Sequence, residues 1–237
     1  MRKRGKKYNE VVKLVDHDKI YTPQEACALV GKLNIAQFNA SVDLHLRMNL
    51  DSRKADQQIR GTVLLPSGSG KVVRIAVFAE GDGARLAQEA GADVVGGDDL
   101  VAKVQGGWLE FDVAMATPSM MGKVGRLGKV LGPRGLMPNP KTNTVVAPEE
   151  LPRVIREARQ GRVEYRLDKM GSIHVPVGKV QFTPEQLMAN LSALMEAISR
   201  AKPSSVKGIY IKKITMAPSM GPGIRVDVNQ SLELKAA

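Results

Sequence analysis

Apolar residues recur at two different spacings along this chain, and the spacing changes between its ends and its middle. In residues 41–50, SVDLHLRMNL, apolar and polar side chains alternate strictly, which is the pattern of a half-buried strand. Residues 61–66, GTVLLP, are predicted to pair with that strand. Residues 162–179 predict a hairpin that turns around Lys169 to Ser172. Further short strands are predicted at 208–217 and 223–228.

Two helix starts share one signature. Thr22-Pro23-Gln24-Glu25 and Thr183-Pro184-Glu185-Gln186 each combine a Thr N-cap, a Pro at the first helical position and an acidic or amide side chain that can complete a capping box. The second start opens an amphipathic helix that ends near Lys202-Pro203. Its apolar stripe is predicted to be core and consists of Leu187, Leu191, Leu194, Met195 and Ile198.

The middle of the chain alternates apolar strands with helices, a pattern typical of a small α/β unit with a covered, largely parallel sheet. Strands are predicted at 71–79 and 111–118, and helices at 83–92, 98–107 and 149–161. The turn-rich LPSGSG at 65–70 and Gln160-Gly161 form natural boundaries. The sequence therefore predicts an α/β protein whose central segment, 68–159, is separate from the terminal segments 1–67 and 160–237.

Charge is unevenly distributed between these segments. The chain carries 35 Lys and Arg against 24 Asp and Glu, a net charge of +11. Residues 68–159 hold 12 basic and 11 acidic residues, so the terminal segments hold 23 and 13, a net charge of +10. Such an excess indicates a polyanionic partner, nucleic acid or an anionic membrane surface, bound by the terminal segments. No apolar run is long enough for a spanning helix, and the basic MRKRGKKY is not followed by the apolar segment of a signal peptide.

Residues 125–140, GRLGKVLGPRGLMPNP, pose the question of a phosphate-binding loop. A Walker loop needs a hydroxyl residue after Gly-Lys, but Val130 follows Gly128-Lys129, and Lys123 stands where the first Gly should be. The glycine order of a dinucleotide fingerprint is also absent. The stretch is instead predicted to be a tightly turned loop that presents three cationic side chains, Arg126, Lys129 and Arg134.

The residues that could support catalysis or metal binding are sparse. Cys27, the single cysteine, lies on a predicted helix without a local base and is interpreted as a small core residue. His17, His45 and His174 are far from Cys and from one another in the sequence, so no metal site is predicted. No carboxylates are paired as acid and base. We expect no cofactor, no metal and no enzymatic activity.

The stretch 125–140 followed by HVPVGK at 174–179 resembles the universal ribosomal protein L-one family, in its bacterial form. Colinear matches extend the resemblance along essentially the whole chain: GKKY, KIYTPQEA, DQQIRGTVLLP, EAGAD and SMGPG. It implies two domains, a discontinuous α+β RNA-binding domain from both chain ends (1–67 and 160–237) and an inserted Rossmann-like α/β domain (68–159). The charge distribution agrees with this division.

The resemblance also implies a function. Members bind large-subunit ribosomal RNA and form the head of the mobile stalk near the tRNA exit site, where the stalk contacts deacylated tRNA. Bacterial members also bind a similar structure in their own mRNA leader and repress its translation. The implied protein is a cytoplasmic, non-enzymatic monomer within the ribosome, with no membrane partner. The alternative is a nucleotide- or phosphate-dependent enzyme built on the central α/β unit, which stabilisation by nucleotide would reveal.

The family's RNA-contact positions carry over onto three parts of this sequence. Gln37 is a departure, because a Lys is common there. Ser219 is a second departure, since it keeps the hydroxyl of the family's Thr without the methyl group that stiffens its rotamer. Hydroxyls, backbone and close approach suit the shallow minor groove of structured RNA, whereas few aromatic residues are present for stacking on single strands. The implied RNA-binding residues are Lys6, Phe38, Ser41, Arg166, Asp168, His174, Ser219, Met220 and Gly221, with Arg126, Lys129 and Arg134 as a possible secondary contact.

Overall fold

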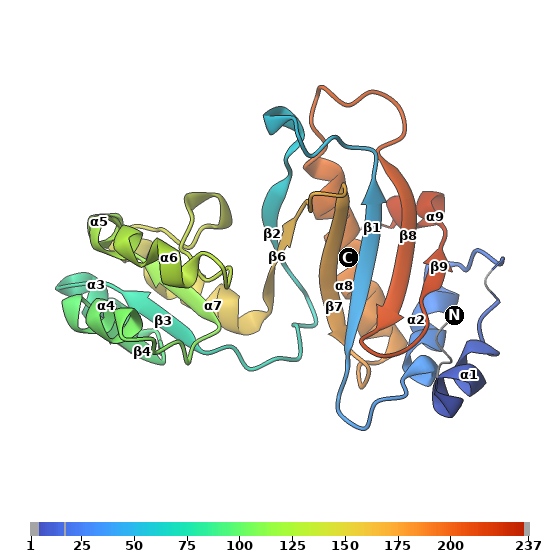
Figure 1. Cartoon of the computed structure of the whole chain (residues 1–237), viewed down its shortest axis with the longest axis horizontal. Coiled ribbons are helices and arrows are strands. Elements are labelled where there is room, and N and C mark those ends of the chain that lie inside the picture. Colours follow the sequence, from blue (N-terminus) through green and yellow to red (C-terminus); the bar gives the residue numbers. More distant parts are fainter. Residues whose placement is uncertain (1–4, 17, 235–237) are drawn as a thin grey trace. The chain divides into compact units, whose positions relative to one another are not determined.

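The computed structural model describes residues 5–16 and 18–234 of a mixed α/β fold (Figure 1). Its contacts divide the chain into two compact units. The terminal unit consists of Met1–Gly70 and Gly161–Ala237, and the central unit consists of Lys71–Gln160. Each unit has its own buried core.

A four-stranded antiparallel sheet forms the centre of the terminal unit. Its order is β7-β1-β8-β9, with β1 at Ser41–Met48, β7 at Ser172–Lys179, β8 at Ile211–Pro218 and β9 at Ile224–Val226. The alternation predicted for β1 is confirmed, because Val42, Leu44, Leu46 and Met48 are buried and their neighbours are not. One face of the sheet is therefore apolar and the other polar.

The predicted partner of β1 is wrong. The segment at Arg60–Leu64 forms β2, which pairs with β6 at Arg162–Arg166 in a separate two-stranded sheet. Both edges of β1 are already occupied by β7 and β8, so β2 has no edge of β1 to join. The predicted hairpin is present, but only Leu167 and Ile173 bridge its two arms, which then belong to different sheets.

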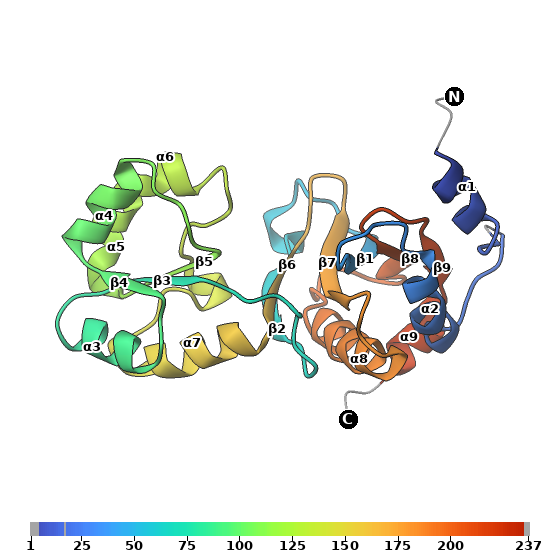
Figure 2. The same cartoon turned by 90° about the horizontal axis from the view of Figure 1, so that it is seen from below.

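Three helices of the terminal unit, α2, α8 and α9, pack against the apolar face of the sheet (Figure 2). Helices α2, Pro23–Val30, and α8, Pro184–Arg200, both begin with the predicted capping boxes, at Thr22 and Thr183. The predicted stripe of α8 is buried, which confirms it as core. The remaining helical segments of this unit are α1 at Lys6–Val12, α9 at Val228–Glu233, and the 3-10 turns η1 at Gly31–Leu33 and η2 at Ala55–Gln57.

The central unit has a parallel three-stranded sheet of order β4-β3-β5, as its alternating pattern predicts. The middle strand β3 is buried along its whole length, because helices cover both faces. Among the strands of this unit, only the short β4 was missed by the pattern. The strands are β3 at Ile75–Phe78, β4 at Val94–Gly96 and β5 at Val113–Ala116, and the main helices are α3 at Asp82–Glu89, α4 at Asp98–Gln105 and α7 at Leu151–Gln160.

The stretch 125–140 is not the simple loop expected from its glycines and prolines. Its first half is helical, because Val124, Leu127 and Leu131 are buried at helical spacing and anchor short turns despite the glycines between them. Gly135 then has a positive φ in the turn that follows. The short segments of this region are η3 at Pro118–Met120, α5 at Met121–Val124, η4 at Gly125–Leu127, α6 at Gly128–Leu131, η5 at Pro140–Thr142 and η6 at Pro148–Glu150.

Candidate nucleic-acid interface

The start of β1 and the end of β8 are joined by a set of short hydrogen bonds. The backbone N–H of Ser41 donates to Oγ of Ser219 at 3.2 Å, and the N–H of Ser219 donates to the Ser41 carbonyl at 3.0 Å. The Ser219 hydroxyl also lies 3.3 Å from that carbonyl. We call Phe38, Ser41, Ser219, Met220 and Gly221 the sheet-end cluster, since these bonds hold its two loops together.

Two large apolar side chains of the sheet-end cluster face solvent. Phe38 and Met220 are each 57 % exposed, and both lie on the loops that the Ser41–Ser219 bonds join. Single exposed apolar residues are common on proteins, but two on adjoining loops of a strongly basic unit offer contact area to a partner. The Phe38 ring lies outside the core, so it does not serve to pack a helix against a strand.

Gly221 is required by packing. A Cβ at this position would lie 2.4 Å from the carbonyl oxygen of Leu33, and the backbone of Gly221 does not have a positive φ. The sequence suggests a glycine that lets a ligand approach; the structure shows a glycine that lets the turn pack on η1. The N–H of Gly221 donates to the Pro218 carbonyl at 3.1 Å, which closes the turn that carries Met220.

Lys179 is a residue of this region that sequence reasoning did not single out. Its Nζ lies 2.9 Å from Oγ of Ser41, so the end of β7 also contributes to the sheet-end cluster. Nearby, the amide of Asn39 donates to Oε1 of Gln181 at 2.9 Å. Lys179 belongs to the HVPVGK segment that carries the family resemblance. Its place in that segment is the sequence signal that could have identified it.

A second group of predicted residues lies at the β6–β7 turn. Oδ1 of Asp168 accepts the backbone N–H groups of Met170 at 2.9 Å and Ser172 at 2.6 Å, so this carboxylate closes the turn. Its other oxygen is 3.4 Å from Nε2 of His174. Desolvation alone raises the pKa of Asp168, but the Ser172 and Met170 N–H groups and the His174 ring outweigh it, so this pKa is lowered.

His174 has a partner that the sequence did not reveal. Its Nδ1 lies 2.8 Å from Nδ1 of His45, the residue opposite it on β1. Burial lowers the pKa of His45, with a further contribution from His174 that outweighs the opposing effect of Asp43. With the proton on Nε2, the position that faces the Asp168 carboxylate, Nδ1 of His174 is free to accept a hydrogen bond from the Nδ1–H of His45. Cross-strand pairing across 129 residues created this arrangement.

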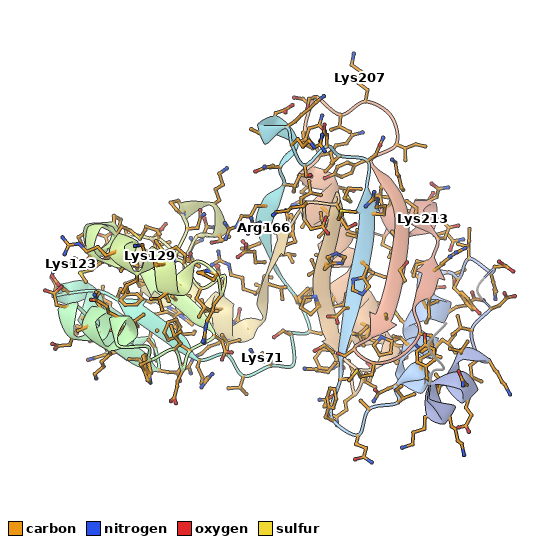
Figure 3. All side chains as sticks on the ribbon, in the orientation of Figure 1. Lys71, Lys123, Lys129, Arg166, Lys207 and Lys213 are labelled. Atoms are coloured by element: carbon orange, nitrogen blue, oxygen red, sulfur yellow. The ribbon has the colours of Figure 1, made fainter. Side chains whose placement is uncertain are left out.

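The remaining predicted residues are separate from these two groups. Arg166 is exposed at the end of β6, directly across from Arg60 of β2, and is labelled in Figure 3. Lys6 is exposed in the first turn of α1. The three cations of the secondary contact, Arg126, Lys129 and Arg134, are exposed, and the described part of the chain shows no ion pair for them. Lys123, by contrast, lies 2.7 Å from Asp98 and 3.0 Å from Glu80, which raises its pKa.

Neither a reactive thiol nor a metal-binding cluster is found among the described residues. Burial raises the pKa of the Cys27 thiol to about 12, so it stays protonated within the core. Among residues 5–16 and 18–234, no three His, Cys, Asp or Glu side chains are placed to hold a metal ion; His17 lies outside these ranges. No helix in the described part of the chain is long and apolar enough to cross a membrane.

A strongly basic chain with a polar sheet face and two solvent-facing side-chain groups has the features of a protein that binds a polyanion. Comparison with known proteins specifies the class. The chain belongs to the Ribosomal protein L1p/L10e family, whose sequence profile matches residues 30–222.

Two relatives cover nearly the whole chain. It is 55 % identical over 234 residues to the "Large ribosomal subunit protein uL1" of Thermomicrobium roseum, covering 98 % of this chain and 97 % of that protein. It is 54 % identical over 236 residues to the protein of the same name from Chloroflexus aggregans, with coverage of 99 % and 100 %. The chain is thus a bacterial ribosomal protein, a structural constituent of the ribosome in the cytoplasm. Family membership rules out the alternative of a nucleotide- or phosphate-dependent enzyme.

Proposed function

We propose that this constituent of the large ribosomal subunit binds ribosomal RNA through its terminal unit, with the sheet-end cluster as the principal contact. The single observation that carries the proposal is the exposure of Phe38 and Met220 on two loops that the Ser41–Ser219 bonds hold together. Apolar side chains of this kind contact riboses and base edges, while hydroxyl and backbone groups suit the shallow minor groove of structured RNA. The net charge of +10 on the terminal segments supplies the attraction to phosphates.

The terminal unit would serve as the RNA-binding domain, and the central unit as an inserted domain. The bound protein would form the head of the mobile stalk beside the tRNA exit site, as a monomer within the ribosome. Arg126, Lys129 and Arg134 are exposed on the central unit and suit a secondary contact with RNA, including exit-site tRNA. The same RNA-binding surface would bind the leader of the protein's own mRNA and repress its translation.

The binding is tested with large-subunit ribosomal RNA made by transcription, followed by fluorescence anisotropy against an unrelated duplex of equal length. Met220→Ala should weaken binding to ribosomal RNA about tenfold and leave the duplex affinity nearly unchanged, because an apolar contact depends on fit. Equal affinity of the wild-type protein for the two RNAs would contradict the proposal.

The ribosomal and regulatory roles are separated by two assays. Co-sedimentation with large subunits that lack this protein tests assembly into the ribosome. A translation reporter preceded by the protein's own mRNA leader tests repression, and Met220→Ala should relieve it. If the protein sediments with large subunits but the reporter is unaffected, the repression is withdrawn and the ribosomal role stands.

A further inference from the structure

The two faces of the four-stranded sheet differ in what covers them. Helices α2, α8 and α9 lie against one face (Figure 2), and no helix of the described residues packs on the other, which faces the viewer in Figure 1. An antiparallel sheet with one solvent-facing side needs only polar residues there. The open face carries cationic and histidine side chains as well as neutral polar ones. The sequence alone does not show which of these residues lie opposite one another on neighbouring strands.

The register places a basic and polar row across all four strands. His45 of β1 lies opposite His174 of β7 on one side and Thr215 of β8 on the other, and Thr215 lies opposite Arg225 of β9. Arg225 is exposed, whereas its neighbours along β9 are buried. The row therefore runs from the histidine pair to a cation at the far edge of the sheet.

A second row lies two residues further along β1. Arg47 is opposite Ser172 of β7 and Lys213 of β8. The Arg47 guanidinium donates to the Met170 carbonyl and approaches Oγ of Ser172 at 3.4 Å, which fixes its direction. Lys213, labelled in Figure 3, is exposed on β8.

The pairing of Arg47 with Lys213 is unfavourable for the isolated protein. Like charges directly opposite each other on neighbouring strands destabilise a sheet. In the described part of the chain, neither Lys213 nor Arg225 forms an ion pair that would offset this repulsion. An anion that bridges the rows removes the repulsion, so the arrangement favours a negatively charged partner.

The open face is continuous with the sheet-end cluster. Ser41, Asp43, His45 and Arg47 are on the same side of β1, because residues two apart share a face. Asp43 is the one carboxylate on this side of β1, and it lies opposite Pro176 and Ala217, in a row that contains neither Lys213 nor Arg225. From Ser41 to Arg47 the face extends roughly 20 Å along the strand, and across four strands roughly 14 Å. A surface of this size accommodates several phosphates of one RNA backbone.

We propose that the open face of the β7-β1-β8-β9 sheet is a further RNA-backbone contact, in which Arg47, Lys213 and Arg225 bind phosphates. The proposal rests on the proposed binding of ribosomal RNA and extends that site along the sheet. Apart from the two histidines, the face has no aromatic side chains, so it suits the backbone of structured RNA and lacks a stacking platform for single strands. None of its three cations belongs to the family-derived positions.

The test compares charge-removing variants that differ only in location. Lys213→Gln and Arg225→Gln are made singly and together, with Lys207→Gln as the matched control on the exposed loop before β8. Binding to transcribed large-subunit ribosomal RNA is followed by anisotropy across a series of salt concentrations, and folding is checked by circular dichroism.

Each lost phosphate contact should weaken binding about fivefold at 0.1 M salt, and the double variant about 25-fold, with a salt slope shallower by roughly 1.5. Lys207→Gln should change the affinity less than twofold. If the double variant stays folded and binds ribosomal RNA as tightly as Lys207→Gln does, the open face is not an RNA contact. That result would leave the proposed role of the sheet-end cluster standing. If the wild-type protein itself does not bind ribosomal RNA specifically, the proposed function fails first, and the two failures are thus distinguishable.

Discussion

Asn190 offers a stringent test of how the terminal unit is held together. Its side chain lies on α8 and is completely buried. Oδ1 accepts the backbone N–H of Ser67 at 2.9 Å, and Nδ2 donates to the carbonyls of Gly68 at 3.0 Å and Val177 at 2.7 Å. One amide therefore ties β7 to the segment through which the chain leaves the terminal unit, and Asn190→Ala removes all three bonds.

The expected loss follows from these three bonds. Each contributes about 0.5–1.5 kcal/mol to stability, and a buried group left without a partner costs more than the bond itself contributes. The Val177 carbonyl is covered by the core in the variant, so we expect a total loss of about 3–4 kcal/mol in the free energy of unfolding. Asn190→Asp retains an acceptor for Ser67 but sets a carboxylate against two carbonyls, so its loss should be at least as large at neutral pH.

Urea unfolding followed by circular dichroism measures this loss. Asn229→Ala is the control, because Asn229 is exposed on α9 and its replacement should change the stability by less than about 0.5 kcal/mol. The slope of free energy against urea should stay constant, so that midpoints can be compared. A loss below about 1 kcal/mol for Asn190→Ala would refute the reasoning, since it would mean that water replaces the amide without cost.

Three further predictions concern the candidate interface. Gly221→Ala should lower the free energy of unfolding by about 1–3 kcal/mol, since its Cβ would meet the Leu33 carbonyl, whereas Gly125→Ala, with open space around it, should be nearly neutral; thermal unfolding distinguishes them. Phe38→Ala should leave stability within about 0.5 kcal/mol but cost at least roughly 1 kcal/mol in ribosomal-RNA binding, and an unchanged affinity in anisotropy would contradict this. Because the pKa of His45 is lowered by folding, the unfolded chain binds more protons below about pH 6.5, so stability should fall from pH 7.5 to 5.5; His45→Gln should flatten this fall in urea midpoints.

The local parts of the fold could be predicted from the sequence because their causes are local. The Thr22 and Thr183 capping boxes depend on residues three apart, and the alternation of β1 depends on residues two apart. The pairing of strands could not be predicted in this way. Both β2 and β7 can be recognised as strands from the sequence, but which of them joins β1 depends on the core that the whole terminal unit buries.

The candidate site was accessible mainly through resemblance to a family. Nothing in the local sequence relates Ser219 to Ser41, since 178 residues separate the two ends of their hydrogen bond. His45 was on the polar side of a correctly predicted strand, but its partner His174 could be identified only once β7 was known to lie beside β1. The exposure of Phe38 likewise depends on how its loop leaves the core.

The position of β1 in the sheet constrains how a nascent chain folds. β1 ends at Met48, whereas its partners begin at Ser172 and Ile211, so the first strand leaves the exit tunnel long before either neighbour. At 5–20 residues per second, the wait for β7 alone is roughly 6–25 s. The segment Lys71–Gln160 has all its own contacts by then and can fold during synthesis. The Ser41–Ser219 bonds form only when the chain is almost complete, so unfinished chains lack the sheet-end cluster. Under the proposed function, such chains would not compete with finished protein for RNA.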